Sequence, residues 1–370
     1  MAKHIDFSAH VLAVFNEMKT DYDAMTNLMT DVALNHISFD EEAGREIPRA
    51  EAEAKILAFS RQVLQINDIR DRKHVRRAIR DNARAWFDVI EDTLDVTVQT
   101  GLQESEWFQI LVEDKSINYG DRQDFYAEDD GVLAVARVGE SHHDHILQRL
   151  VSGQSYSIPT YRYGVKIGAD INKYILGDIS WEKMVAAITK AFILMIQEEV
   201  YAELKKAVDA LPANTFKGTG VLTKEKFDEI IENVGSVNGS DVVIIGTKNA
   251  LKNLNKIADV DWIAASQKEA VAKTGILGDY EGSKLIVIPN RFADKTLTTK
   301  LFDDKELYII PNVENKFIKF VDEGDQEVTE VSEKGEANGR QDDMMTFETQ
   351  RRFGVASVVA KNFGAWKFAA

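Results

Sequence analysis

The feature that most constrains the fold of this chain is one unbroken run of about thirty residues with helical periodicity. Asp178 and Ser180 offer caps at its start, and Leu211-Pro212 ends it, because the residue before a proline disfavours helix. At 1.5 Å per residue the predicted rod is roughly 45 Å long, which favours an elongated subunit over a compact enzyme domain. Its apolar stripe consists of Trp181, Met184, Val185, Ile188, Phe192, Met195, Tyr201, Leu204 and Val208.

The size and composition of the chain are those of a large globular protein. Its 370 residues predict one elaborated fold or two subdomains, and 44% hydrophobic residues are enough for a sizeable core. No stretch approaches eighteen consecutive apolar residues, so we expect no membrane partner. The absence of cysteine excludes disulfides, thiol nucleophiles and thiolate metal sites. The formal net charge of −16 argues against wrapping nucleic acid, except at local basic patches.

The first hundred residues are predicted to be helical. One helix carries an apolar stripe from Val11 to Val32, a second begins with Pro48 at its first position and runs to about Ile66, and a third covers 68–91. Five basic residues at steps of three and four form one face of the third helix: Arg70, Lys73, Arg77, Arg80 and Arg84. This face could contact an acidic neighbour or nucleic acid. The blander interpretation is a solvated face partly paired with Asp71, Asp81 and Asp88, as weak surface pairs are common.

The period then changes to that of strands. Alternating residues predict strands at 94–98, 107–112, 131–138 and 155–167. A polar segment with His142, His143 and His145 separates the last two of these strands. Two extended arms around a polar connection predict a long projecting hairpin.

The second half of the chain alternates between apolar strands and helices. Strands are expected at 241–246, 284–289 and 306–311, a helix follows Thr223, another follows the cap Thr247, and one more covers 261–273. The end of the chain is predicted as strands at 316–321 and 325–331 and as one long extended stretch at 346–368. Buried strands interleaved with helices indicate a compact α/β subdomain, within a chain that we assign to the α+β class.

No motif indicates catalysis. The histidines from His142 to His145 could share a metal only in a turn, and a polar loop tip is the more common explanation of such a cluster. Gly246-Thr247-Lys248 lacks the other glycines of a phosphate-binding loop, so Thr247 is better explained as a helix cap. We therefore expect no cofactor and no enzymatic activity.

The order of elements resembles that of the major capsid proteins of tailed bacteriophages, the HK-ninety-seven-type fold that encapsulins share. The likeness is sharpest in Ile158-Pro-Thr-Tyr-Arg162 with Tyr174-Ile-Leu-Gly-Asp-Ile-Ser-Trp181, which resembles the exit of the extended loop into the spine helix. It is also seen in Gly275-Ile-Leu-Gly-Asp-Tyr-Glu-Gly282 and in Phe347-Glu-Thr-Gln-Arg-Arg-Phe-Gly-Val355, which resemble parts of the axial and peripheral subdomains.

The resemblance implies a division of the chain into six parts. These are a helical N-terminal arm at 1–94, the start of the peripheral subdomain at 95–117, the extended loop at 118–157, the peripheral subdomain with the spine helix at 158–214, the axial subdomain at 215–293, and the remaining axial strands with the return to the peripheral subdomain at 294–370.

The resemblance also implies a function and a set of partners. Copies of the chain would form homo-hexamers and homo-pentamers of an icosahedral head shell around double-stranded DNA, assembled in the host cytoplasm and retained in the virion. Portal, scaffold and decoration proteins would be further partners, with DNA at the inner face. Contacts between subunits are expected at Phe125, Tyr126, Arg137, Arg149 and Tyr156. An encapsulin-like nanocompartment and a metal-dependent enzyme using His142 to His145 remain the alternatives.

Overall fold

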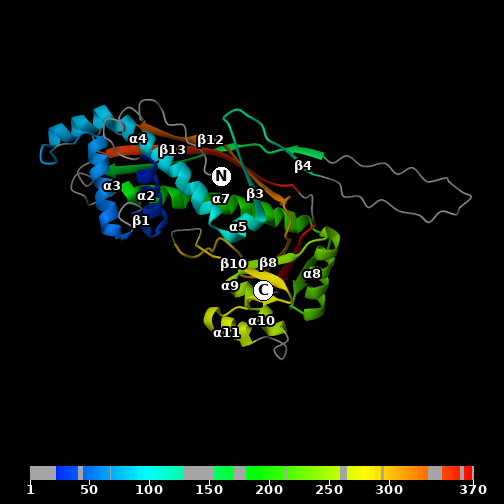
Figure 1. Cartoon of the computed structure of the whole chain (residues 1–370). Helices are drawn as coiled ribbons and strands as arrows, with labels where there is room; N and C mark the ends of the chain where they lie inside the picture. Colours follow the sequence, from blue (N-terminus) through cyan, green and yellow to red (C-terminus); the bar gives the residue numbers. More distant parts are fainter. Residues whose placement is uncertain are drawn as a thin grey trace, which may run out of the picture. The chain divides into compact units, whose positions relative to one another are not determined.

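A computed structural model describes most of the chain and divides it into two compact units (Figure 1). The described residues are 22–40, 45–66, 68–127, 154–170, 181–213, 215–258, 265–292, 296–331, 344–358 and 362–368. Unit 1 comprises Met1–Ser105, Tyr161–Gln197 and Glu323–Phe353, and unit 2 comprises Glu106–Thr160, Glu198–Asp322 and Gly354–Ala370. The chain passes from one unit to the other five times, at 105/106, 160/161, 197/198, 322/323 and 353/354. The overall composition of helices and strands confirms the predicted α+β class.

Helices dominate the N-terminal part of unit 1. They are α2 (Tyr22–Leu34), α3 (Arg49–Val63) and α4 (Arg72–Gln103), with a short ladder of β1 (Ser38–Asp40) and β2 (Arg45–Ile47). Pro48 lies one residue before the first turn of α3, because its ψ of 140° is extended and not helical. Helix α2 corresponds to the second half of the first predicted helix, and the part of that helix before residue 22 lies outside the described residues.

The predicted strand at 94–98 is wrong, because these residues continue α4. Leu94 and Val98 are both buried, and the same two residues that alternate along a strand are also one helical turn apart. Thr93 and Thr97 donate their hydroxyls to carbonyl oxygens four residues earlier, which satisfies two buried polar groups inside the helix. The helix instead begins at Arg72, where the Asp71 carboxylate accepts bonds from the amides of Lys73 and His74.

The long helix is confirmed as α7 (Trp181–Ala210). Six members of the predicted stripe are buried: Met184, Val185, Ile188, Phe192, Tyr201 and Leu204. Met195 and Val208 are only half-buried, while Ile196 and Val200, which the prediction did not include, are buried. Its predicted caps Asp178 and Ser180 lie outside the described residues.

A four-stranded sheet has the order β3-β12-β13-β6. Its strands are β3 (Val112–Ile117), β12 (Ile318–Val331), β13 (Met344–Ser357) and β6 (Tyr161–Asp170). The two alternating segments predicted at 316–321 and 325–331 form the single strand β12. Within unit 1, β13 pairs antiparallel with β6 over ten residues, with Phe353 opposite Tyr161 and Phe347 opposite Ile167.

The core of unit 2 is a six-stranded mixed sheet in the order β7-β14-β11-β8-β10-β9. Its strands are β7 (Lys217–Gly220), β14 (Gly364–Phe368), β11 (Glu306–Pro311), β8 (Val242–Thr247), β10 (Ser283–Ile288) and β9 (Asp279–Tyr280). The strands β8, β10 and β11 lie within a residue of their predicted positions, and every residue of β8 and β11 is buried. The helices are α5 (Glu106–Leu111), α8 (Lys224–Asn238), α9 (Lys248–Leu251), α10 (Leu254–Ile257) and α11 (Ala265–Thr274).

Four further predictions fail or are revised in or near this unit. Residues 107–112 form α5 followed by β3, because Trp107, Phe108 and Leu111 are buried at helical spacing. Pro159, which has no amide hydrogen, separates β5 (Gln154–Ser157) from β6, so 155–167 is not one strand. The stretch at 346–368 is likewise divided, since β13 ends at Ser357 and β14 belongs to the other sheet. The helix after Thr247 is the pair of short helices α9 and α10.

Gly218 is required by the pairing of β7 with β14. It lies opposite Trp366, and a Cβ added at Gly218 would be 2.1 Å from the buried indole ring. We expect Gly218→Ala to lower the free energy of unfolding by about 1–3 kcal/mol, because the ring has to move within a packed core. Gly278→Ala is the control, since a Cβ there meets nothing within 4 Å. Urea unfolding of both variants checks this, and equal midpoints would contradict it.

Candidate functional site

The base of the predicted hairpin is an antiparallel ladder of β4 (Asp124–Ala127) and β5 (Gln154–Ser157), drawn in Figure 1. Phe125 is opposite Tyr156, and Tyr126 is opposite Ser155. Arg122 reinforces the base by donating from its Nε to the Ser157 hydroxyl at 2.6 Å. The pairing that a hairpin requires is therefore present at its root, and its remainder, residues 128–153, lies outside the described residues.

Phe125 is an internal anchor of this base. Its side chain is 3% exposed and packs in a small cluster with Ile158 and Val321. Two ammonium groups lie over its ring, the Nζ atoms of Lys115 at 4.9 Å and of Lys319 at 5.4 Å from the ring centre. A ring so enclosed by its own chain has little surface for a neighbour, so its predicted role as a direct contact residue is revised to that of an anchor.

Tyr126 and Tyr156 have the exposure that a contact residue needs. Their side chains are 53% and 43% exposed. Tyr156 is opposite Phe125 and shares its face of the ladder, so Tyr126, the next residue after Phe125, points to the other face. Tyr119 is also exposed, in the turn where the amide of Asp121 donates to the carbonyl of Asn118. Our sequence reasoning missed Tyr119, although the following Gly120, with a φ of 85°, marks that turn.

An ion pair of the buried Lys319 with Glu113 lies next to Phe125. The ammonium of Lys319 contacts the carboxylate of Glu113 and donates to Asn315 Oδ1 at 2.5 Å. Desolvation opposes ionisation of Glu113, but bonds from Lys319 and then Lys115 outweigh it and lower the pKa of Glu113. The carboxylate therefore stays charged at neutral pH and holds both lysines near the aromatic ring.

The other predicted contact residues and the histidine cluster cannot be placed. Arg137, Arg149, His142, His143 and His145 all lie outside the described residues. Within the described ranges, no three His, Asp or Glu side chains are close enough to share a metal ion. No helix in the described part of the chain is long and apolar enough to cross a membrane.

Four of the five residues of the predicted basic face belong to α4, and the fifth, Arg70, precedes the helix, because the helix begins at Arg72 after its cap Asp71. Arg70, Lys73 and Arg77 are exposed. Arg80 and Arg84 belong to the helix, but their side chains are outside the described part of the structure. Asp71, one of the acids expected to pair with this face, caps the helix, and the amides of His74 and Lys73 lower its pKa.

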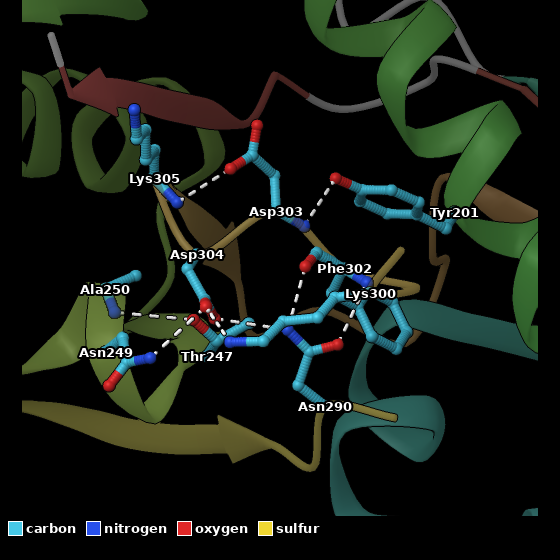
Figure 2. Close-up of polar contacts among 10 residues, drawn as sticks. All are labelled: Tyr201, Thr247, Asn249, Ala250, Asn290, Lys300, Phe302, Asp303, Asp304 and Lys305. Atoms are coloured by element: carbon cyan, nitrogen blue, oxygen red, sulfur yellow. Dashed lines mark hydrogen bonds and ion pairs between the residues drawn. The ribbon is translucent and has the colours of Figure 1, made fainter. Parts of the chain in front are cut away.

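A network of polar side chains in unit 2 joins the residue range that follows β10 to the one that precedes β11, at Asn290 and at 300–304 (Figure 2). The Asn290 side chain donates to the carbonyl of Phe302 at 2.8 Å and accepts from its amide at 3.1 Å. Asp304 accepts from Asn290 and Asn249 at 3.1 and 3.2 Å, and Lys300 is its ionic partner. The predicted cap is confirmed, since the Thr247 hydroxyl accepts from the amide of Ala250.

The charge of Asp304 depends on this network. Burial opposes its ionisation, but hydrogen bonds from Lys300, Asn249, Thr247 and Asn290 lower the pKa of Asp304 to about 2. The carboxylate should contribute about 2 kcal/mol of stability, fully present above its unfolded pKa near 3.8 and lost as the pH falls through about 2. In Asp304→Asn this contribution is absent at every pH. When the pH is lowered from 5 to 2, the urea midpoint of unfolding should fall less in Asp304→Asn than in the wild type. Equal decreases in the two proteins would contradict this role of Asp304.

Comparison with known proteins gives one family and several solved structures. Residues 24–367 match the profile of a family described as "SPbeta prophage-derived putative capsid protein YonB". A search of curated proteins finds no match. Similar solved structures include the mature capsid of bacteriophage PhiM1, with 13% identity, 70% of this chain and 86% of that chain covered, and a TM-score of 0.49. A virus-like particle from Pyrococcus furiosus is 14% identical, with 74% and 98% covered and a TM-score of 0.42.

Proposed function

The chain belongs to the family of SPbeta prophage-derived capsid proteins, and from this membership we propose that it forms the icosahedral head shell of a tailed phage around double-stranded DNA. Its copies assemble as homo-hexamers and homo-pentamers. The observation that carries the proposal is the family match, which spans nearly the whole chain from residue 24 to residue 367. The protein is a structural component of the virion, and no enzymatic activity is assigned to it.

In this proposal each part of the chain has a mechanical role. Residues 118–157 form the extended loop laid over a neighbouring copy, and 1–94 form a helical arm. The peripheral subdomain takes in 95–117 and 158–214, and the axial subdomain takes in 215–293, with 294–370 completing both. The rooted hairpin base supports this division, because an arm that binds a neighbour needs a fixed origin.

The tyrosines at the hairpin base are the proposed contacts. Aromatic residues dominate the binding energy of many interfaces, because they bury a large area at a small cost in side-chain entropy. Tyr126 and Tyr156 are exposed on opposite faces of β4–β5, so one arm can contact two surfaces. A closed lattice repeats each contact many times, so individually modest interfaces of about 1,000 Å² give a durable particle.

In this proposal the negative charge of the protein keeps the DNA from binding tightly to the inner wall of the shell. The net charge of −16 repels the DNA backbone over most of the protein. Local DNA contact, if made by described residues, falls to the exposed Arg70, Lys73 and Arg77. Portal, scaffold and decoration proteins complete the assembly, which takes place in the host cytoplasm.

Electron microscopy of the purified chain tests the proposal. We expect uniform polyhedral shells in negative stain, with DNA in particles isolated from infected or induced cells. Shells that consistently hold cargo protein and no nucleic acid would support a nanocompartment instead. A stable monomer with a bound metal and a turnover that needs His142, His143 and His145 would support an enzyme and overturn the proposal.

A further inference from the structure

Helices α9 and α10 carry three exposed lysines at steps of four residues, here called the basic ridge: Lys248, Lys252 and Lys256. The helical winding of α9 continues into the turn before α10, because the amide of Lys252 donates to the carbonyl of Lys248 at 3.2 Å. The other side of this segment is apolar and buried, and it consists of Ala250, Leu251 and Leu254. The three lysines therefore share one surface that points away from the core of unit 2.

The first two lysines of the basic ridge lie side by side. A Cβ built on Gly275, at the end of α11, would lie 3.5 Å from Cε of Lys252 and 3.8 Å from Cε of Lys248, so both side chains lie over one turn. The third, Lys256, donates to Oδ1 of Asn253, an uncharged group. Among the described residues, none of the three ammonium groups has an ionic partner. Like charges four residues apart on a helix repel each other, so the ridge is unfavourable in an isolated copy.

Helix α8 carries the opposite charge in a similar arrangement. Its outer face holds three exposed glutamates at steps of four and three residues, here called the acidic ridge: Glu225, Glu229 and Glu232. The inner face of the helix is buried and consists of Phe227, Ile230 and Val234. Within the described part of the chain the acidic ridge forms no ion pair, whereas the adjacent Lys224 pairs with Glu281 at 2.6 Å. The three glutamates therefore repel one another as the three lysines do.

The two ridges match in length and are opposite in sign. At 1.5 Å per residue each is roughly 10–12 Å long. Other lysines of unit 2, such as Lys273, Lys284 and Lys367, pair with an acid of their own copy. Within unit 2, Figure 1 shows α8 and α9 on opposite sides of β8, so the two ridges of one copy do not face each other. In a chain of net charge −16, an unpaired basic surface is attracted to the acidic surface of another copy.

We propose that the basic ridge of one copy binds the acidic ridge of the next copy. Pairing of lysines with glutamates across the contact removes the repulsion that each ridge carries alone. Because the two ridges are different surfaces of one unit, the contact is head-to-tail, and its repetition closes a ring. The inference rests on the proposed shell function and adds to it the surfaces that join neighbouring copies in hexamers and pentamers.

Charge reversal at the central residue of each ridge tests the contact. Lys252→Glu should lower the yield of shells at least tenfold, because an acidic side chain then meets the acidic ridge. Glu229→Lys should do the same for the opposite reason, and the two changes in one chain should restore the yield. Lys305→Glu is the matched control, since it makes the same change in net charge at an exposed position of unit 2 outside both ridges, and it should assemble normally.

Cross-linking tests the same contact without background, because the chain has no cysteine. A lysine paired with a glutamate separates the two backbones by more than the roughly 7 Å that a disulfide spans, so a short bis-maleimide is used to join the thiols. Lys252→Cys with Glu229→Cys should give a ladder that ends at five and six copies when treated shells are run on denaturing gels. Lys305→Cys with Glu229→Cys is the control and should give no ladder.

The outcomes separate this inference from the proposed function. If the wild type forms shells, normal assembly of Lys252→Glu would overturn the inference and leave the shell function standing. The same conclusion follows if Glu229→Lys fails to restore the yield, or if the double-cysteine shells give no ladder. Failure of the wild-type chain to form shells would remove both. The urea midpoint of each unassembled variant should equal that of the wild type, because the substituted side chains are exposed, and the cross-linking result decides for any reversed variant that does not fold.

Discussion

Tyr126→Ala should abolish or strongly impair shell formation while leaving the free energy of unfolding of the subunit within about 0.5 kcal/mol of the wild type. Phe125→Ala should instead lower the free energy of unfolding of the isolated subunit by about 3 kcal/mol. The two residues are adjacent, but Phe125 is enclosed by Ile158 and Val321 while Tyr126 is 53% exposed. The buried Phe125 should therefore affect the stability of the subunit, and the exposed Tyr126 should affect shell assembly.

The two variants are compared by urea unfolding of unassembled subunits and by particle counts in negative stain. Tyr126→Phe is the control for Tyr126→Ala, because it keeps the ring and should retain most of the assembly. Phe125→Leu is the control for Phe125→Ala, because a smaller loss of packing should cost less stability. Normal shells from Tyr126→Ala would remove Tyr126 from the interface. An unchanged unfolding midpoint in Phe125→Ala would show that the packing of Phe125 against Ile158 and Val321 contributes little to the stability of the subunit.

The family could be recognised from the sequence because its strongest signals are local. The resemblance to phage capsid proteins is confirmed by the family match. Helix α7 and strands β8, β10 and β11 were predicted nearly to the residue, because each has an uninterrupted stripe or run of apolar side chains. In such segments the pattern of burial and the local conformation agree, so no distant contact is needed to decide between them.

Short segments were misassigned where two periods fit equally well. Leu94, Val96 and Val98 alternate as in a strand, but Leu94 and Val98 also lie one turn apart on a helix. The preceding helix resolves the ambiguity, because extending a formed helix needs no new nucleation. The five residues 94–98 contain too few repeats of either period to distinguish a helix from a strand by sequence alone.

The candidate site was predictable in its location but not in its chemistry. The sequence placed a hairpin near Tyr126, yet it could not show that Phe125 faces inward, because its partner Val321 is far along the chain. Asp304 was one of many acidic residues in pairs, and its significance depends on Asn249 and Asn290, which are 55 and 14 residues away. Long-range partners of this kind leave no local pattern.

Asp95→Asn should destabilise unit 1 by about 3 kcal/mol, because it leaves a buried guanidinium beside a neutral amide. Arg351 lies in β13 with a side chain that is 2% exposed, and its Nη1 is 3.1 Å from Oδ1 of Asp95 in α4. The pair therefore joins α4 to β13 within unit 1. Breaking it costs far more than the loss of an exposed pair, since water cannot replace the missing partner.

The matched comparison is Lys166→Gln, which breaks a second ion pair to the same strand. Lys166 and Glu348 are separated by 3.8 Å and are 52% and 32% exposed, so their loss should cost less than about 1 kcal/mol. Urea is the appropriate denaturant, because it adds no ions that would screen either pair. Adding Arg351→Met to Asp95→Asn should recover part of the lost stability, because it removes the charge that Asp95 balanced. If Asp95→Asn and Lys166→Gln proved equally mild and Arg351→Met recovered nothing, the buried pair would not be what holds α4 to β13.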